Sequence, residues 1–407
     1  LSLPVGKSMP IVFALVLCLL VPSATSAQVL SESTFLSALD RGHPAMRVLE
    51  RELAEAAASK QEASLWANPS IAADRESWGT DAQQTTVSLF WTPPLLGRLG
   101  PDRAAARHRA VAANLQAEVA RMELRRTARE AYATWWESTE RQRILSEQAA
   151  RVRVAAERVP GRADRGEESG LTARRFELAR FRVEAQTVRA AAGLAEASAT
   201  LRTWLQEPER SHEPVRPDLP NPPDSVSVSG HPLVLARSAI VEAAGHALSG
   251  AGRLVASPIL EFGWTWEDGT SDGRDGPVAG IALELPVFDR NQGDRTRARG
   301  ASRAAHAELE LETHRVREAA QAAQSAYRAL RDPALRTWTQ SEDLDAMIEA
   351  ALAAFQAGER TDTDLLDALD AVLDARLGGL ELYAAALAAH RTLEVAAGLP
   401  LTEGASR

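Results

Sequence analysis

An internal duplication is the feature that most constrains how this chain folds. Landmark residues recur in the same order and at nearly constant spacing: His43-Pro44 at His231-Pro232, Pro69 at Pro258, Gly100 at Gly293, and Gly166 at Gly358. A constant offset over many positions distinguishes an internal repeat from chance similarity. Each half is therefore expected to contain a short helix, a second helix, two strands joined by a loop, a long helix, a glycine turn and a final helix.

The clearest junction between strand and helix lies in the second half. The stretch Phe288-Asp289-Arg290-Asn291-Gln292-Gly293 follows an alternating strand that ends at Pro286, and it precedes an Ala-, Arg- and Glu-rich run that begins near Asp294. A degraded copy of this junction lies at Leu99-Gly100-Pro101-Asp102-Arg103 in the first half.

The expected boundaries follow from the repeat and from the positions of proline and glycine. The first repeat covers 28–207, with strands at about 69–78 and 84–93 and long helices at about 101–159 and 171–205. A proline-rich connector covers 208–224. The second repeat covers 225–400, with strands at about 257–267 and 278–287 and long helices at about 294–356, interrupted at Asp332-Pro333, and 361–397. Residues 401–407 form a tail.

Residues 1–27 have the properties of a secretory signal peptide. Lys7 precedes an apolar run from Ile11 to Leu20, and the small residues up to Ala27 suit a cleavage site. The apolar run is too short for a spanning helix. Cys18 is the only cysteine, and Leu-Val-Leu-Cys is a poor match to a lipoprotein signal. We therefore expect neither a lipid anchor nor a disulfide.

Composition favours helices and argues against several classes of protein. Ala, Arg, Glu and Leu dominate while aromatic residues make up 5%, which favours long helices packed through small side chains. The formal net charge of -9 argues against a nucleic-acid partner. The sequence has no phosphate-binding glycine loop, zinc-ligand cluster or nucleophile elbow. We therefore expect no catalytic residue, no metal site and no cofactor.

The strand candidates alternate between apolar and polar residues. In the second half Leu260, Phe262 and Trp264 share one face, and Glu261 shares the other with Thr265. This pattern fits a soluble sandwich with an apolar core, or a membrane barrel with apolar residues facing lipid. Strands of about 9 to 11 residues suit a tilted bilayer crossing. One hairpin per repeat is too little sheet to stand alone, so several chains would have to combine to close a barrel.

The whole mature chain resembles the TolC family of outer-membrane efflux channels, and within it the branch of CzcC-like heavy-metal cation exporters. The resemblance rests on Phe288 to Gly293 after a strand, on Asn68-Pro69 before the first strand, and on Phe355 to Thr361 followed by Asp364 to Ala368. It implies a mainly α-helical protein with membrane β-structure. Three chains would form a homotrimer whose twelve-stranded β-barrel, with four strands per chain, continues into a long α-helical tunnel.

The same resemblance implies a location and partners. Such a protein lies in the lipid of the outer membrane of a Gram-negative bacterium and extends into the periplasm. It works with a periplasmic adaptor protein and an inner-membrane pump of the RND type.

The resemblance also assigns candidate pore and gate residues. Asp364 and Asp367 match positions that form acidic rings at the periplasmic constriction, where carboxylates attract cations. From the residues alone, a solvated acidic face near a helix N-terminus is the simpler interpretation. Arg360 and Phe355 match positions that hold the closed tip. Phe355 stands where the family has a tyrosine, so we predict a weakly latched tip.

Further candidates lie in turns and strands. Gly166, Leu171, Gly358 and Thr361 match turns that contact the adaptor in the family. The two glycines are also explained as turn residues with positive φ. Glu261 and Glu284 are expected to face the lumen of the barrel.

The sequence thus predicts a passive outer-membrane exit channel of a tripartite efflux system, with no enzymatic activity and with metal cations as a candidate cargo. The alternative is a periplasmic coiled-coil adaptor or scaffold of an export complex. That alternative explains the long helices but not the paired alternating hairpins. An adaptor would be soluble without detergent once any anchor is removed, whereas a channel would not.

Overall fold

The structure, a computed structural model, describes residues 28–78, 82–93, 99–163, 170–205, 212–253, 258–268, 275–283, 285, 287–342 and 344–398. Its helices are α1 (Glu32–Gly42), α2 (Pro44–Glu62), α3 (Leu99–Ala163), α4 (Gly170–Arg202), α5 (Pro232–Ala251), α6 (Gln292–Glu342), α7 (Leu344–Gln356) and α8 (Asp362–Ala396). Its strands are β1 (Gln28–Leu30), β2 (Ser70–Trp78), β3 (Ala82–Trp91), β4 (His212–Pro214), β5 (Ile259–Asp268) and β6 (Gly276–Ala282). The described part of the chain is therefore mainly helical.

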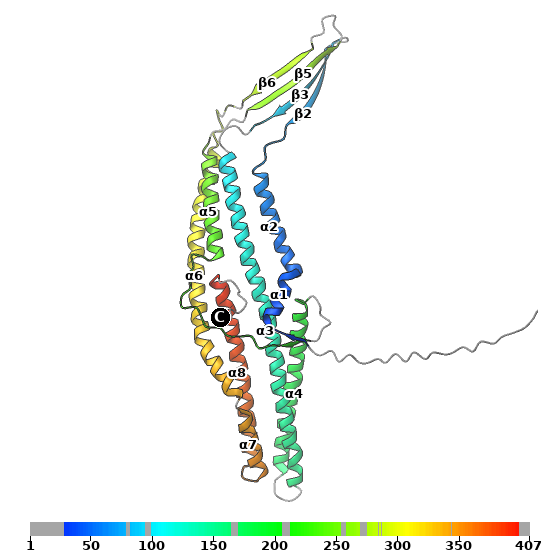
Figure 1. The fold of residues 1–407 in the computed structure, drawn as a ribbon, viewed down its shortest axis with the longest axis vertical. Coiled ribbons are helices and arrows are strands. Elements are labelled where there is room, and N and C mark those ends of the chain that lie inside the picture. The colour runs from blue at the N-terminus through cyan, green and yellow to red at the C-terminus, as the bar shows by residue number, and fades with distance from the viewer. Residues whose placement is uncertain are drawn as a thin grey trace, which may run out of the picture.

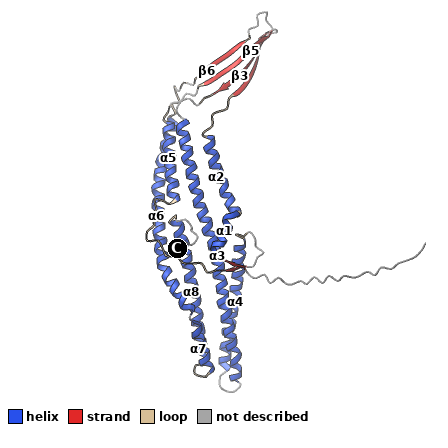
Figure 2. Cartoon of the chain, viewed as in Figure 1, coloured by secondary structure: helices blue, strands red, loops and turns tan. Residues whose placement is uncertain are grey.

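The helices run side by side along a rod, and one sheet lies at its end (Figures 1 and 2). The first repeat supplies α2, β2, β3, α3 and α4, and the second supplies α5, β5, β6, α6, α7 and α8. The strands of both hairpins therefore meet at the same end of the rod, while the end of α3, the start of α4 and the turn after α7 lie at the other.

A histidine near the start of each repeat makes the same two hydrogen bonds. His43 and His231 each precede a helix, and Nδ1 accepts a hydrogen bond from the backbone N–H of Ala45 (3.2 Å) or Leu233 (3.1 Å). Because Nδ1 is the acceptor, Nε2 carries the proton. Nε2 donates to the carbonyl of Thr203 (3.2 Å) in the first repeat and of Val395 (3.1 Å) in the second. The start of each repeat is thus tied to the end of its last helix.

The sheet has the order β2-β3-β5-β6, with antiparallel neighbours. Register places Leu89 opposite Phe262 on the apolar face, and Ser88 opposite Gly263 on the polar face. Phe262 is 56% exposed, whereas Ser88 is 2% exposed. A soluble sandwich would bury its apolar face. This sheet exposes the apolar face, whereas Ser88 and Thr265 at the centre of the polar face are buried; Asp74 and Glu76 at the edge of that face are exposed.

The core is a row of clusters along the rod rather than a single centre. One joins α1 and α2 to α3 and α4 around Phe35 and Tyr132. The next joins α3, α6 and α8 around Trp136 and Tyr383. The third packs α3, α4, α7 and α8 together towards the turns. Each level of the rod is therefore held by its own buried side chains.

All three tyrosines of the chain hold the connector between the repeats. The Tyr132 hydroxyl lies 2.8 Å from the carbonyl oxygen of Val215. Tyr327 donates to the carbonyl of Pro220 at 2.5 Å, and Tyr383 donates to that of Pro217 at 2.8 Å. Burial raises the pKa of Tyr327 to about 12, so this phenol remains a donor at neutral pH. The described part of the connector is therefore bound at three points between Val215 and Pro220.

Three element boundaries differ from the sequence-based expectation. The helix α3 continues through Pro160-Gly161 and ends at Ala163. These residues form the last turn of a 65-residue helix, so the preceding turns are already in place to continue it. The helix α6 passes through Pro333. The neighbouring Ala334 is fully buried, and Leu330, Leu335 and Trp338 pack against the same cluster; together these contacts offset the roughly 3 kcal/mol that an internal proline costs.

The strand β6 is shorter than expected and ends at Ala282. Ala282 pairs with Ile259, so the next residue of β6 would face Pro258. Proline has no N–H to donate to the ladder, and the strand stops there.

Candidate functional site

The turn between α7 and α8 lies at the end of the rod opposite the sheet (Figure 1). Gly358 has a φ of 77°, a conformation that glycine adopts without strain. The N–H of Glu359 donates to the carbonyl of Ala354 at 2.9 Å, and that of Gly358 donates to the carbonyl of Phe355 at 3.1 Å. This pair of bonds is a Schellman motif, which ends α7 and reverses the chain.

Thr361 and Asp364 form a capping box at the start of α8. The Thr361 hydroxyl accepts a hydrogen bond from the Asp364 N–H at 3.2 Å, and the Asp364 carboxylate accepts one from the Thr361 N–H at 3.1 Å. Hydrogen bonds from the Thr361 backbone and hydroxyl lower the pKa of Asp364. Asp364 is therefore ionised at neutral pH and also stabilises the helix start.

The other predicted tip residues lie around this turn. Phe355 is buried, and its ring centre is 6.0 Å from that of Phe176 on α4. Arg360 and Asp367 are exposed, as is Leu171 at the start of α4. Gly166 lies outside the described residues. The structure thus gathers Phe355, Gly358, Arg360, Thr361 and Asp364 at one turn and places Asp367 just beyond it on α8.

Two ion pairs join α4 to α8 above the turns. Arg175 lies 3.7 Å from Asp362 and donates to the Thr363 hydroxyl at 3.0 Å. Arg182 lies 3.1 Å from Asp370. The guanidinium side chains of both arginines are about half exposed, so each pair contributes under about 1 kcal/mol.

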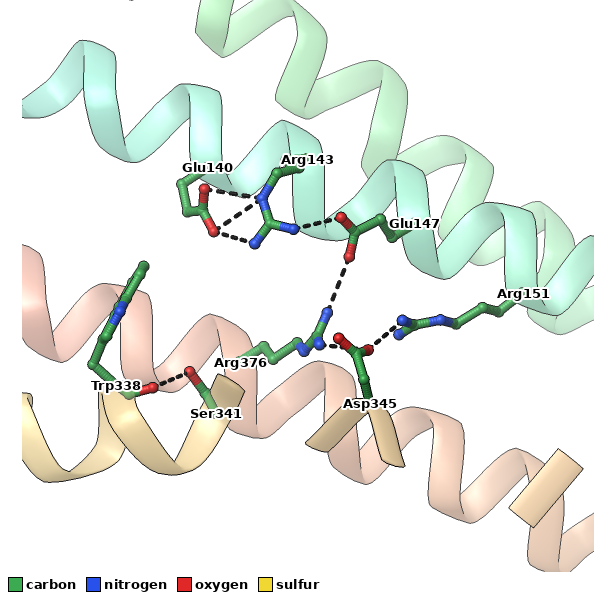
Figure 3. A network of polar contacts seen from close by, with 8 residues as sticks. All are labelled: Glu140, Arg143, Glu147, Arg151, Trp338, Ser341, Asp345 and Arg376. Carbon is green, nitrogen blue, oxygen red and sulfur yellow. Dashed lines mark hydrogen bonds and ion pairs between the residues drawn. The ribbon is translucent and has the colours of Figure 1, made fainter. Parts of the chain in front are cut away.

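A larger network links α3, α7 and α8 farther from the turns (Figure 3). Arg376 on α8 lies 3.1 Å from Glu147 on α3 and 2.6 Å from Asp345 on α7. Arg151 also pairs with Asp345, and Arg143 with Glu147. Burial alone would raise the pKa of Asp345, but hydrogen bonds from Arg376 and Arg151 lower it. The network therefore joins the two repeats with ionised groups.

The sequence contained a signal for Arg376 that our sequence reasoning did not use. The buried face of α8 follows alternating steps of four and three residues: Leu365, Leu369, Val372, Arg376, Gly379 and Tyr383. A charge at such a position faces a partner helix and needs a counter-charge there. The identity of the partner helix, however, depends on the fold.

A second buried network joins the start of α1 to the end of α8. Glu32 accepts hydrogen bonds from Arg129 on α3 at 3.0 Å and from Arg391 at 2.7 Å. Arg129 also pairs with Glu394. Burial opposes ionisation of both carboxyls. At Glu32 the two arginines outweigh burial, and the pKa is lowered. At Glu394 burial prevails, and the pKa is raised.

Glu261 lies on the polar face of the sheet. The Ser88 hydroxyl donates to its carboxylate at 2.8 Å. Gly280 lies beside it, and a Cβ at that position would come within 3.0 Å of the Glu261 carboxylate. The side chain is therefore accommodated against the sheet by a glycine and a serine on the two flanking strands. Glu284 lies outside the described residues.

Within the part of the chain that the structure describes, no group of three or more histidine and acidic residues is arranged to hold a metal ion. None of the helices among these residues combines the length and apolar character needed to cross a membrane.

Comparisons with known proteins give matches in structure only. No protein-family model matches the chain, and no curated protein matches it. CusC, studied for the conformational changes that accompany folding and transmembrane channel formation, superposes with a TM-score of 0.76 at 16% identity, over 90% of this chain and 92% of CusC.

Two further solved structures are similar over comparable lengths. The outer membrane protein VceC from Vibrio cholerae gives a TM-score of 0.74 at 17% identity, over 90% of this chain and 96% of VceC. The CmeC outer membrane channel of Campylobacter jejuni gives 0.72 at 12% identity, over 98% of this chain and 93% of CmeC. The chain therefore has the fold of this group of outer-membrane channels, as its resemblance to the TolC family predicted.

Proposed function

We propose that the protein is an outer-membrane exit channel of an efflux system, which conducts cargo passively and performs no chemistry. The observation that carries this proposal is the exposure of the sheet's apolar face, where Phe262 and Trp264 lie open to solvent while Ser88 and Thr265 at the centre of the polar face are buried. An apolar face of this kind is favourable against lipid tails and unfavourable in water. The likeness in fold to outer-membrane channels supports the same function.

In this proposal three chains each contribute four strands to one barrel, whose outer surface is the apolar face. Strands of this number give a barrel wide enough for an aqueous lumen. The sheet then lies in the outer membrane of a Gram-negative bacterium, and the helical rod extends into the periplasm. Glu261 and Glu284 face the lumen.

At the other end of the rod, the turns form the entrance. Asp364 and Asp367 would place carboxylates at the constriction, and Arg360 and Phe355 would hold it closed. A periplasmic adaptor would contact the turns at Gly166, Leu171, Gly358 and Thr361 and link the channel to an inner-membrane RND pump. Metal cations are the proposed cargo, based on the CzcC-like motif from Phe288 to Gly293.

Imaging of single particles tests this function. The protein would be expressed with its residues 1–27, extracted from outer membranes in detergent and imaged. We expect a hollow tube with threefold symmetry and a barrel at one end. A thin monomer that stays soluble without detergent would instead support a periplasmic adaptor.

A further inference from the structure

Positive charge gathers where the rod meets the sheet (Figure 1). Residues 99–110 and 287–303, which include the starts of α3 and α6, hold eight arginines and three aspartates, although the whole chain has a net charge of -9. The N-terminus of a helix carries the positive end of the helix dipole, so cations are unfavourable there and an anion is favourable. This end of the rod is therefore suited to an anionic partner.

One arginine has the same place in both repeats. Arg103 donates through Nη2 to the carbonyl of Ser64, just after α2, at 2.7 Å. Arg295 donates through Nη2 to the carbonyl of Gly252, just after α5, at 2.5 Å. In both arginines Nε is buried and has no hydrogen-bond partner among the residues that the structure describes. A guanidinium has five N–H donors, so each of these side chains has donors left for an anion.

A cleft beside Arg103 collects further cations. It lies between α2 and α3 and has a volume of about 600 Å³, and it is lined by Ala57, Lys60, Gln61, Ser64, Arg103 and Arg107. Lys60 and Arg107 are exposed. None of the described residues that line the cleft is acidic. This basic cleft therefore presents three cations without a carboxylate among them.

The other side of the contact between α2 and α3 has a different character. A second cleft of about 510 Å³ is lined by Glu52, Glu55 and Asp102 as well as by Arg109. Arg107 and Arg109 are two positions apart on α3, so their side chains point about 200° apart around the helix. The surplus of cations therefore lies on the side of Arg107.

Apolar side chains border the basic cleft towards the sheet. Leu65 and Trp66, directly after Ser64, are 61% and 54% exposed. The Trp66 ring stacks on that of Trp91 with centres 5.6 Å apart, and Trp91 follows Leu89 by two residues on the apolar face of β3. The apolar face and the basic cleft therefore adjoin. A phospholipid has the same order of parts, with acyl chains followed by a phosphate.

We propose that the basic cleft binds the phosphate group of an anionic phospholipid from the membrane leaflet on the periplasmic side. Lys60 and Arg107 attract the phosphate, and Arg103 donates hydrogen bonds to its oxygens. The acyl chains lie along the apolar face of the sheet. A zwitterionic headgroup would add an ammonium group beside three cations, so an anionic headgroup is preferred.

The second repeat offers a related contact. Arg299 follows Arg295 at the same spacing as Arg107 follows Arg103. Lipid bound at both places would fix how deeply the sheet sits in the bilayer. This inference rests on the proposed channel, because an outer-membrane location is what brings this end of the rod to a lipid leaflet.

Native mass spectrometry tests the site. The protein is purified from outer membranes in detergent and titrated with phosphatidylglycerol or with phosphatidylcholine, and inorganic phosphate is added as a competitor. The double variant Lys60→Gln with Arg107→Gln removes two cations from the basic cleft. Arg109→Gln is the matched control, because it removes the same charge from the same helix but from the other cleft.

We expect phosphatidylglycerol to bind more tightly than phosphatidylcholine. Each cation near a lipid surface strengthens binding about fivefold, so the double variant should bind phosphatidylglycerol about 25-fold more weakly. Arg109→Gln should bind it like the unmodified protein. The pair Lys60→Arg with Arg107→Lys keeps both charges and should retain binding, and it covers the case in which the glutamine variant fails to fold.

Equal affinity of the unmodified protein and the glutamine double variant would overturn the proposal. Equal weakening by Arg109→Gln would overturn it as well, because net charge alone would then explain the binding. Displacement of the lipid by an equal concentration of inorganic phosphate would identify a site for free phosphate instead. Threefold tubes that show no preference for phosphatidylglycerol would refute the lipid site and leave the channel standing, whereas a soluble monomer would refute both.

Discussion

Lowering the pH from 7 to 5 should destabilise the protein through His390. This histidine lies on α8 beside the buried network of Glu32, Arg129, Arg391 and Glu394. Its Nδ1 is 3.7 Å from the Glu394 carboxylate, and its ring centre is 4.9 Å from that of Tyr327. Burial, together with repulsion from Arg129 and Arg391, lowers the pKa of His390 from 6.5 to about 4.

The direction of the effect follows from this lowered pKa. Between pH 6.5 and 4 the unfolded chain binds a proton at His390 that the folded chain does not, so the free energy of unfolding falls as the pH falls. For a pKa that changes from 6.5 to about 4, the loss between pH 7 and pH 5 is about 2 kcal/mol. In a chain of this size that corresponds to a melting temperature about 3 °C lower.

The assay compares thermal melting of the purified protein with that of His390→Gln, followed by circular dichroism in detergent at both pH values. The variant loses the packing of the imidazole ring and is less stable at both pH values, so only the change in melting temperature between the two pH values is compared. We expect a smaller change for the variant. Other histidines and carboxyls contribute equally to both proteins, and His306→Gln, at an exposed position of α6, should retain the full change. Equal changes for the unmodified protein and His390→Gln would refute the reasoning.

Three further predictions concern the network around Arg376, the helix cap at His231 and the polar face of the sheet. Arg376→Met should lower the free energy of unfolding by about 1 to 3 kcal/mol, because Asp345 and Glu147 lose a buried counter-charge. Arg143→Met removes ion pairs within α3 only and should lower it by about 0.5 kcal/mol. Equal melting temperatures for the two variants would contradict this prediction. Since the pKa of Asp345 is lowered below that of an ordinary aspartate, the extra loss in Arg376→Met should disappear as the pH falls through this lowered pKa. His231→Ala should cost about 1 kcal/mol more than His231→Asn, because asparagine can still accept the Leu233 N–H, and the opposite order in thermal melting would argue against the cap. In a protein that conducts ions, Glu261→Gln should reduce the preference for cations, measured as a reversal potential in a KCl gradient. If the reversal potential is unchanged in Glu261→Gln but changes in Asp367→Asn, the preference for cations arises at the tip instead.

The repeating landmarks allowed the order of elements to be predicted from the sequence alone. Proline, glycine and apolar spacing are local signals, and they located both hairpins and both long helical pairs. Local signals failed at Pro333 and at the end of β6, because packing of Ala334 and pairing with Pro258 decide those boundaries. The resemblance to the TolC family predicted the fold that the structural comparisons show.

The polar networks could be predicted only in part. Arg376 interrupts an apolar seam of α8, so a buried charge was visible in the sequence, but its partners Glu147 and Asp345 lie in other helices and are identified by the fold. The role of Asp364 in a capping box was readable, since Thr361 precedes it by three residues. The contacts of the three tyrosines with the connector were not, because backbone carbonyl acceptors leave no mark in the sequence.

Those tyrosine contacts have a consequence for how the protein matures. Tyr132 belongs to the first repeat, and Tyr327 and Tyr383 belong to the second, so the connector is fully held only after both repeats have docked. Until then its carbonyls are open to solvent and its backbone is accessible to proteases. Resistance of the segment from His212 to Asp224 to cleavage therefore marks the moment at which a newly made chain has joined its two halves.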